Sequence, residues 1–248
     1  MDRMVENGFL ERVNAVRARV TVACRRAGRD PCQVSIVAVS KTFGPEEVAA
    51  VAACGLNVFG ESRVQEAAQK IPLCPGHLEW HMVGHLQRNK VRAAVRLFRM
   101  IHSVDSLRLL EAIDAACEEV GCRLPVLLEV NVSGESSKFG LAPADVPAVL
   151  ERSSALMRVS IVGLMTIPPF TEDPEGARPY FRRLRELREA WRESSGFDLP
   201  ELSMGMSHDF EVAVEEGATL VRIGTAIFGV RRQQPRKGAA ASEMTPAE

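Results

Sequence analysis

A lysine at the end of an apolar segment is the first residue of this chain that could carry out chemistry. Lys41 directly follows the run VSIVAVS (34–40), and the turn residues Gly44 and Pro45 come soon after it. The run consists mainly of small and β-branched residues, which favours a short buried strand. The lysine is then either a solvated strand end or an amine held in a site, where its nitrogen can attack a carbonyl carbon.

Two later segments, SMGMS (203–207) and RIGTA (222–226), combine glycines with hydroxyl residues before a predicted helix start. Backbone N–H groups in such a position are suited to binding a phosphate. Either segment alone is also compatible with an ordinary strand-to-helix turn, because glycine and serine are common turn residues. A lysine amine and a phosphate site together would suit an aldehyde that carries a phosphate, and pyridoxal 5′-phosphate is such a molecule.

Arg222 belongs to the second of these segments and would lie beneath the ring of such a ligand. A permanent cation beside the pyridine nitrogen disfavours protonation of that nitrogen. The ring is then a weaker electron sink and supports a carbanion less well.

The elements that must position these residues follow a regular alternation. Helical patterns such as PEEVAAVAACG, SLRLLEAIDAACEEVG and ARPYFRRLRELREAWRESSG separate short apolar segments. The apolar segments predict strands over 34–40, 56–60, 78–83, 100–104, 125–132, 159–166, 200–204 and 219–223. Eight strand–helix units in about 200–250 residues are typical of a single (β/α)8 TIM-type barrel, an α/β fold. An open doubly wound sheet is disfavoured, because the chain has neither a GxGxxG nor a GxxxxGKS/T loop.

The two ends of the chain differ in character. Residues 2–28 predict an amphipathic helix before the barrel, with apolar residues at helical spacing: Phe9, Leu10, Val13, Val16 and Val20. No linker divides the chain, so residues 1–229 are predicted to be one barrel domain. Residues 230–248 lack apolar periodicity, which predicts a disordered tail.

Active sites of this barrel class lie at the carboxyl ends of the strands. The polar residues at the predicted strand ends are Lys41, Glu61, His81–His85, Ser103, Asn131, Thr166, Ser203–Ser207 and Arg222–Thr225. Side chains two residues apart on a strand point to the same face of the sheet, so Lys41 shares a face with Val39, and Asn131 shares one with Glu129. Each residue alone is weak evidence, but together they predict a site lined from several strands.

Charge and cysteine content narrow the class of protein. The chain has 31 Lys and Arg against 32 Asp and Glu, which argues against a nucleic-acid binder with a broad basic face. No apolar run approaches the length of a membrane span, and the N-terminal segment has no apolar signal core. The six cysteines form no CxxC motif, a pattern that favours reduced thiols and a cytoplasmic protein. We therefore predict neither a membrane nor a nucleic-acid partner.

Seven segments, in order along the chain, resemble the pyridoxal phosphate homeostasis family, which is related to the barrel domain of alanine racemase. They are VAVSKT (37–42), FGESRVQE (59–66), LEWHMVGHLQRNK (78–90), IHSVDS (101–106), EVNVSGESSKFG (129–140), VGLMTIP (162–168) and SMGMSHDFEVAVEEGATLVRIGTAIFG (203–229). The resemblance implies a single alanine-racemase-like barrel that binds pyridoxal phosphate as an imine on Lys41. One departure is Ser62, since the family usually has asparagine after the glycine and glutamate at 60 and 61.

The resemblance also implies roles for residues at the later strand ends. Phosphate contacts are expected around Ser207, Gly224 and Thr225, with Arg222 at the pyridine nitrogen. Together with the polar residues at the strand ends, the predicted cofactor-binding residues are Lys41, His81, Asn131, Ser207, Arg222, Gly224 and Thr225.

The family's function then becomes the expected one. The protein is expected to be a carrier or regulator in intracellular pyridoxal phosphate homeostasis, without committed catalysis, and to be a monomer that serves apo forms of pyridoxal-phosphate-dependent enzymes. The alternative is a pyridoxal-phosphate-dependent amino-acid racemase on the same barrel. Racemisation normally needs two placed acid/base groups. The only tyrosine, Tyr180, falls in the helix predicted after the sixth strand, outside the barrel mouth.

Two further patterns allow other interpretations. His77, His81 and His85 are spaced by four, as zinc ligands on a helix are. The segment EWHMVG favours a strand, on which residues four apart lie about 13 Å from each other, so no metal site is predicted. His81 is then a wall of the cofactor pocket or a core histidine. Lys138 lacks a serine three residues upstream, which excludes a Ser-Lys hydrolase motif. It is either a loop lysine or a second amine near the cofactor.

Overall fold

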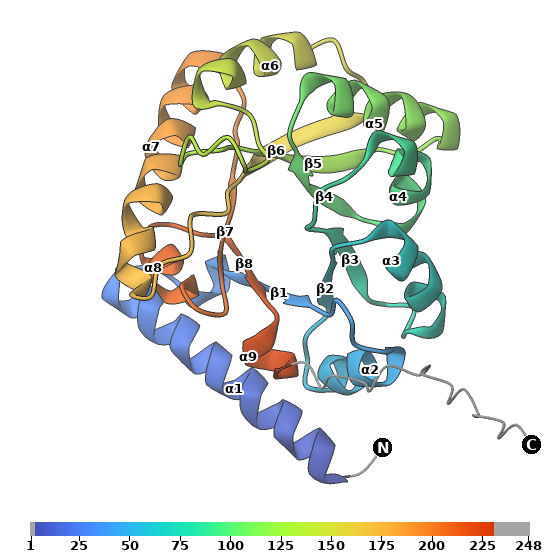
Figure 1. The fold of residues 1–248 in the computed structure, drawn as a ribbon, viewed down its shortest axis with the longest axis vertical. Coiled ribbons are helices and arrows are strands. Elements are labelled where there is room, and N and C mark those ends of the chain that lie inside the picture. Colours follow the sequence, from blue (N-terminus) through green and yellow to red (C-terminus); the bar gives the residue numbers. More distant parts are fainter. Residues whose placement is uncertain (1–2, 231–248) are drawn as a thin grey trace, which may run out of the picture.

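The computed structural model describes residues 3–230, and within them the apolar segments form a closed barrel of eight parallel strands (Figure 1). The strands are β1 (Ser35–Val39), β2 (Val58–Glu61), β3 (Glu79–Met82), β4 (Met100–Val104), β5 (Leu124–Glu129), β6 (Val159–Met165), β7 (Glu201–Met206) and β8 (Leu220–Ile223). Each strand pairs with its neighbours in the chain, and β1 pairs with β8 to close the ring. The predicted (β/α)8 barrel is confirmed, and every predicted strand overlaps an observed one.

Helices surround the ring of strands (Figure 1). They are α1 (Arg3–Arg26), α2 (Pro45–Ala53), α3 (Val64–Lys70), α4 (Val91–Leu97), α5 (Leu107–Val120), α6 (Val146–Ser153), α7 (Arg178–Ser195), α8 (Phe210–Glu215) and α9 (Thr225–Phe228). Their apolar stripes pack on the sheet, as in α7, which buries Phe181, Leu184, Leu187 and Trp191. The predicted tail, 230–248, lies outside the described residues except for Val230.

The long helix α1 contacts α2, α8 and α9 on the outside of the barrel. Phe9, Val13, Val16 and Val20 are buried, as their spacing predicts, whereas Leu10 is 44% exposed. Leu10 follows Phe9 directly and therefore lies about 100° around the helix from the buried stripe. Arg12 Nε donates a hydrogen bond to the Ile227 carbonyl oxygen at 2.7 Å. This bond ties α1 to the short helix that follows β8.

The barrel interior has both an apolar and a polar part. The apolar part is the cluster Val37, Val39, Val83, Leu127, Met165 and Leu220. Paired residues of neighbouring strands point to the same side of the sheet, so Arg222, which pairs with Val37, also points inward. The polar part consists of His81, His102, Ser203 and Arg222, each at most 5% exposed. Buried polar side chains need hydrogen-bond partners. These four are linked to one another by hydrogen bonds, and Arg222 also donates to the Thr166 carbonyl oxygen.

Candidate functional site

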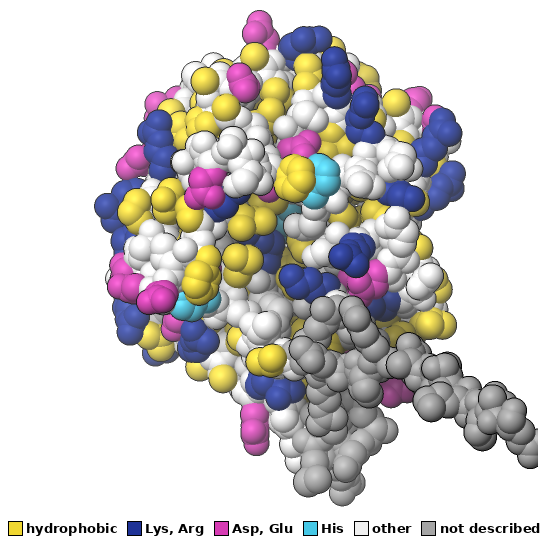
Figure 2. All heavy atoms as spheres, viewed as in Figure 1, with side chains coloured by type: hydrophobic (Ala, Val, Ile, Leu, Met, Phe, Trp, Pro, Cys, Tyr) yellow, Lys and Arg dark blue, Asp and Glu magenta, His cyan; other side chains and the backbone are white. Residues whose placement is uncertain are grey.

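A cavity of about 380 Å³ lies at the carboxyl ends of β1, β2 and β8. Its wall has three parts: Val39 with 41–43 after β1, then Ser62, Arg63 and Glu66 after β2, and Gly224, Thr225 and Gly229 after β8. Figure 2 shows a hollow near the middle of this face, edged by hydrophobic and basic side chains. The volume is in the usual range for a small-molecule site, and the cavity lies where active sites of this barrel class are found.

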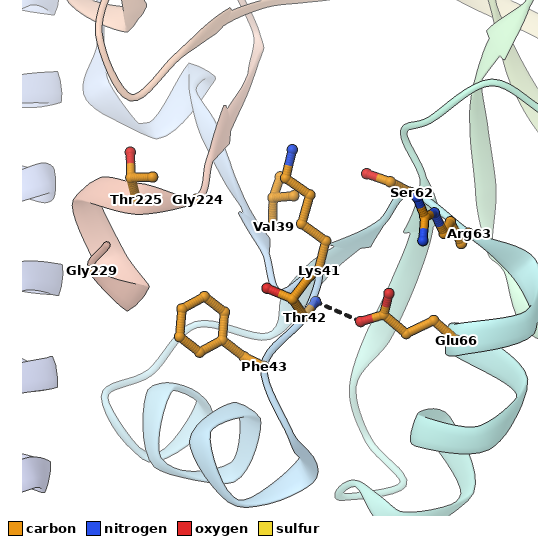
Figure 3. Close-up of a pocket in the computed structure, with 10 residues that line it drawn as sticks. All are labelled: Val39, Lys41, Thr42, Phe43, Ser62, Arg63, Glu66, Gly224, Thr225 and Gly229. Carbon is orange, nitrogen blue, oxygen red and sulfur yellow. Dashed lines mark hydrogen bonds between the residues drawn. The ribbon is translucent and has the colours of Figure 1, made fainter. Parts of the chain in front are cut away.

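Lys41 is the amine of this cavity. Its side chain stands between the Gly224–Thr225 side and the Ser62 side (Figure 3). Its Nζ makes no hydrogen bond or ion pair with any of residues 7–230, whose side chains the structure describes. By contrast, Lys70 Nζ donates to the Ser40 carbonyl oxygen, Glu61 Oε1 and Glu66 Oε1 at 2.9, 2.7 and 2.9 Å. Those bonds use all three donors of the Lys70 ammonium, so of these two lysines only Lys41 is available to a ligand.

The turns after β7 and β8 meet beside the cavity. Ser207 Oγ accepts hydrogen bonds from the N–H groups of Gly224 and Ala226, both at 3.2 Å. Gly205 makes the first turn possible, because its φ is +91° and a Cβ there would lie 2.6 Å from Ala213 Cβ. The two predicted segments are therefore brought together, and backbone N–H groups converge on one oxygen acceptor. Such convergence is the geometry by which backbone amides bind anions.

Arg222 lies deeper in the barrel and does not line the cavity. Its guanidinium donates to Ser203 Oγ at 2.6 Å and to the Thr166 carbonyl oxygen at 2.9 Å. Burial lowers the pKa of Arg222 to about 10, although the carboxylates of Glu129 and Asp209 oppose this shift. The side chain is therefore a fixed cation at neutral pH.

His81 is connected to Arg222 through two intervening side chains. His102 Nδ1 lies 2.9 Å from Ser203 Oγ, and His102 Nε2 lies 3.0 Å from His81 Nδ1. Burial lowers the pKa of His81 to about 4. Burial, together with the neighbouring His81 and Arg222, holds the pKa of His102 well below its ordinary value. Both rings are thus neutral at physiological pH, and the structure places His81 in the barrel core and not among the residues that line the cavity.

Asn131 is held by its own loop. Its Nδ2 donates to the Glu135 carbonyl oxygen at 2.8 Å, and its Oδ1 accepts from Ser133 Oγ and the Gly134 N–H. The structure does not bring this side chain to the cavity, and its predicted contact with the cofactor stays a prediction. Lys138 does not line the cavity either, because its Nζ donates to a carbonyl oxygen of the β6–α7 loop, that of Ile167, at 3.3 Å.

Sequence reasoning missed three buried groups near the site. The sequence patterns assign no role to Lys70 or His102 and mark Glu129 only by its strand parity. The sequence offers one signal for Glu129, since this residue ends the apolar segment LPVLLE. In the structure its side chain is 6% exposed. Burial raises the pKa of Glu129 to about 7, while the Arg222 cation lowers it and Asp105 raises it further.

Among the side chains that the structure describes, those of residues 7–230, no group of three or more His, Cys, Asp or Glu is arranged to hold a metal ion. The same part of the chain contains no helix with both the length and the apolar character needed to cross a membrane.

Comparison with known sequences supports the resemblance of the seven segments. Residues 12–232 match the family model of the alanine racemase N-terminal domain. The pyridoxal phosphate homeostasis protein of Aquifex aeolicus is 46% identical over 223 residues, which are 90% of this chain and 98% of the relative. The protein of that name from Homo sapiens is 41% identical over 236 residues, 88% of this chain and 85% of the relative.

Solved structures show the same likeness. PipY of Synechococcus elongatus PCC7942, solved with pyridoxal phosphate bound, is 36% identical with a TM-score of 0.78 and covers 89% of this chain and 100% of PipY. Alanine racemase of Corynebacterium glutamicum is 18% identical with a TM-score of 0.62, covering 91% of this chain and 62% of the racemase. At that identity the second match shows a shared barrel fold alone.

Proposed function

Because this chain belongs to the alanine racemase N-terminal domain family and is similar to pyridoxal phosphate homeostasis proteins over most of its length, we propose that it binds pyridoxal phosphate and takes part in pyridoxal phosphate homeostasis. The observation that carries the proposal is the unpartnered amine of Lys41 in a cavity that adjoins the converging N–H groups of Gly224 and Ala226. We place this role in the cytoplasm, which the cysteine pattern supports.

The residues present fit the polar groups of the cofactor. When bound, pyridoxal phosphate supplies an electrophilic aldehyde on an aromatic ring. Lys41 Nζ faces the cavity and would hold the aldehyde covalently. Gly224 and Thr225 in the wall, with Ser207 beside them, would hold the phosphate. These roles use the strand-end lysine and both glycine-containing segments of the sequence.

Arg222 favours a carrier over a catalyst. Its guanidinium is fixed by Ser203 and the Thr166 carbonyl oxygen and remains charged at neutral pH. Arg222 lies deeper than the cavity wall, and the resemblance implies that it would face the pyridine nitrogen of a bound cofactor. A permanent cation there would disfavour protonation of that nitrogen. A cofactor held in this way would be a weak electron sink and would support racemisation poorly.

Among the described residues, the cavity wall offers no free second acid/base group of the kind that a racemase requires. Tyr180 lies in α7, on the outside of the barrel, and is not part of the cavity wall. Glu66 is in the wall, but its Oε1 is already bonded to Lys70 Nζ and the Thr42 N–H. We therefore propose a monomeric carrier that hands the cofactor to apo forms of pyridoxal-phosphate-dependent enzymes and does no chemistry of its own.

The test is covalent uptake of the cofactor by the purified protein. After incubation with pyridoxal phosphate, we expect a visible absorption band and, after borohydride reduction, one pyridoxyl group that mass spectrometry locates on Lys41. Lys41→Ala should lose both the band and the adduct, whereas Lys138→Ala should keep both. A Lys41→Ala protein that still carries a full pyridoxyl group would contradict the assignment of the lysine, and a wild-type protein without any adduct would contradict the proposed function.

A further inference from the structure

A buried cluster of charged side chains lies directly against the segment that carries Lys41. Its centre is Lys70, the last residue of α3, whose side chain is 6% exposed. Lys70 forms ion pairs with Glu61, which is fully buried, and with Glu66, at N–O distances of 2.7 and 2.9 Å. Buried lysines are uncommon and are normally paired. Glu66 also lines the cavity, but the proposed binding of the cofactor gives no role to any of these three side chains.

The cluster holds both neighbours of Lys41. On one side, Ser40 Oγ donates to Glu61 Oε1 at 2.7 Å, and the Ser40 carbonyl oxygen accepts from Lys70. On the other side, the N–H of Thr42 donates to Glu66 Oε1 at 2.5 Å (Figure 3). The backbone on each side of Lys41 is therefore attached to one buried cluster, while the Lys41 side chain is left to the cavity.

The backbone at Thr42 needs such support. Its φ is +73°, in the left-handed region that a β-branched residue rarely adopts. A conformation of this kind persists only where the surrounding structure holds it. The bond to Glu66 is the contact that the structure shows for the Thr42 N–H.

The charge state of Glu66 strengthens its bond to the Thr42 N–H. Burial alone would raise the pKa of Glu66, but hydrogen bonds from the Lys70 ammonium and the Thr42 amide outweigh it and lower the pKa below its ordinary value. Glu66 is thus ionised at neutral pH, and its hydrogen bond to the Thr42 N–H is charge-assisted and correspondingly strong. Burial raises the pKa of Glu61, and the hydrogen bonds from Lys70 and Ser40 oppose that shift.

We propose that Glu66, held by Lys70, is a positioning residue that fixes the Lys41 turn so that Nζ is directed at the aldehyde of the cofactor. This inference rests on the proposed function. In the step concerned, the nitrogen lone pair forms a bond to the aldehyde carbon, and the aldehyde oxygen leaves as water with the two protons of the amine. A nucleophile must approach the carbonyl carbon from a narrow range of directions, so a turn that moves freely reduces the productive fraction.

The test compares two ligands that differ only at the reacting carbon. Pyridoxal phosphate has an aldehyde there, and pyridoxine 5′-phosphate has an alcohol that cannot bond to Lys41. Glu66→Ala should weaken binding of pyridoxal phosphate about tenfold or more, the usual effect of losing a hydrogen bond to a charged group. Because Glu66 also lines the cavity, some loss of affinity for pyridoxine 5′-phosphate is expected as well, but it should be several-fold smaller than the loss for pyridoxal phosphate. Glu66→Gln keeps an acceptor oxygen for Thr42 and should retain most of the affinity for pyridoxal phosphate.

The same turn offers a matched control. Gly44 N–H donates to Glu47 Oε2 at 2.9 Å, which is also a carboxylate-to-amide bond but belongs to the start of α2. Glu47→Ala should leave the ratio of the two affinities unchanged. An equal loss for both ligands in Glu66→Ala, or an unchanged ratio, would overturn the positioning role.

A measurement without any variant gives a second test. In the cofactor-free wild type, the bond to Glu66 should slow hydrogen exchange of the Thr42 amide, and exchange at the rate of an unprotected amide would overturn the inference. The failure of the proposed function is distinguishable from both outcomes, because in that case the wild type would bind neither of the two ligands.

Discussion

Replacement of Glu129 by glutamine should change how the stability of the protein depends on pH. Glu129 ends β5 inside the barrel and is 6% exposed. Its side chain makes no hydrogen bond or ion pair with any of residues 7–230, whose side chains the structure describes. Burial raises the pKa of this carboxyl from the ordinary 4.5 to about 7, and the Arg222 cation opposes only part of that rise. Glutamine has nearly the same shape but no proton to release.

The size of this stability change follows from the pKa of Glu129 in the unfolded chain and in the folded protein. The unfolded chain releases the Glu129 proton near pH 4.5, and the folded protein keeps it up to about pH 7. Between these values the folded state binds more protons, so the stability due to this carboxyl is fully present below about pH 4.5 and is lost as the pH rises to about 7. The difference, 7 − 4.5 = 2.5 pKa units, corresponds to about 3 kcal/mol.

His81 changes the stability of the protein in the opposite direction over a similar pH range. Burial lowers its pKa from 6.5 to about 4, so the folded protein binds fewer protons there and its stability rises with pH. A stability profile of the wild type alone would therefore show two opposed effects. The difference between the wild type and Glu129→Gln removes the contribution of His81 and isolates the carboxyl.

The assay is urea unfolding of both cofactor-free proteins at several pH values from about 5 to about 8. We expect the stability of Glu129→Gln relative to the wild type to increase by about 2–3 kcal/mol across this interval. Carbon-13 NMR of the Glu129 carboxyl would report its titration directly. A stability difference that does not change with pH would refute the reasoning, because it would mean that the folded and unfolded states release this proton at the same pH.

Two further outcomes concern the cofactor. Pyridoxal without its phosphate should bind much more weakly than pyridoxal phosphate, since each charge-assisted bond from the backbone amides near Gly224 is worth about 1.5–3 kcal/mol. The two affinities can be measured by absorption titration. Equal values would contradict the proposed phosphate contacts of Ser207, Gly224 and Thr225. The loaded protein should not convert L-alanine to D-alanine in chiral chromatography after long incubation, but it should reactivate a cofactor-free aminotransferase. Racemisation at ordinary enzyme rates, about 1–1,000 per second, would favour the racemase alternative.

The sequence determined the barrel and the main parts of the site because both depend on local patterns. Apolar segments of strand length that alternate with amphipathic segments specify which face of each element is buried, whatever the rest of the chain does. In a parallel barrel all strands end at one face, so Lys41 and the segments 203–207 and 222–226 had to lie at the same mouth. The alternation of side chains along β1 also directs Val37 and Val39 to the interior, where both are found.

The tertiary structure alone decided which of these residues meet. Lys70 ends the helical segment VQEAAQK, where a lysine is usually exposed, and only the approach of α3 to the end of β1 buries it against Ser40. His102 and Ser203 are 101 residues apart and form a hydrogen bond because the ring of strands is closed. Asn131 follows an inward strand end, yet its side chain forms hydrogen bonds with its own loop. Periodicity reports the face on which a side chain lies, whereas contacts between distant segments depend on strand register and loop path, which no local pattern encodes.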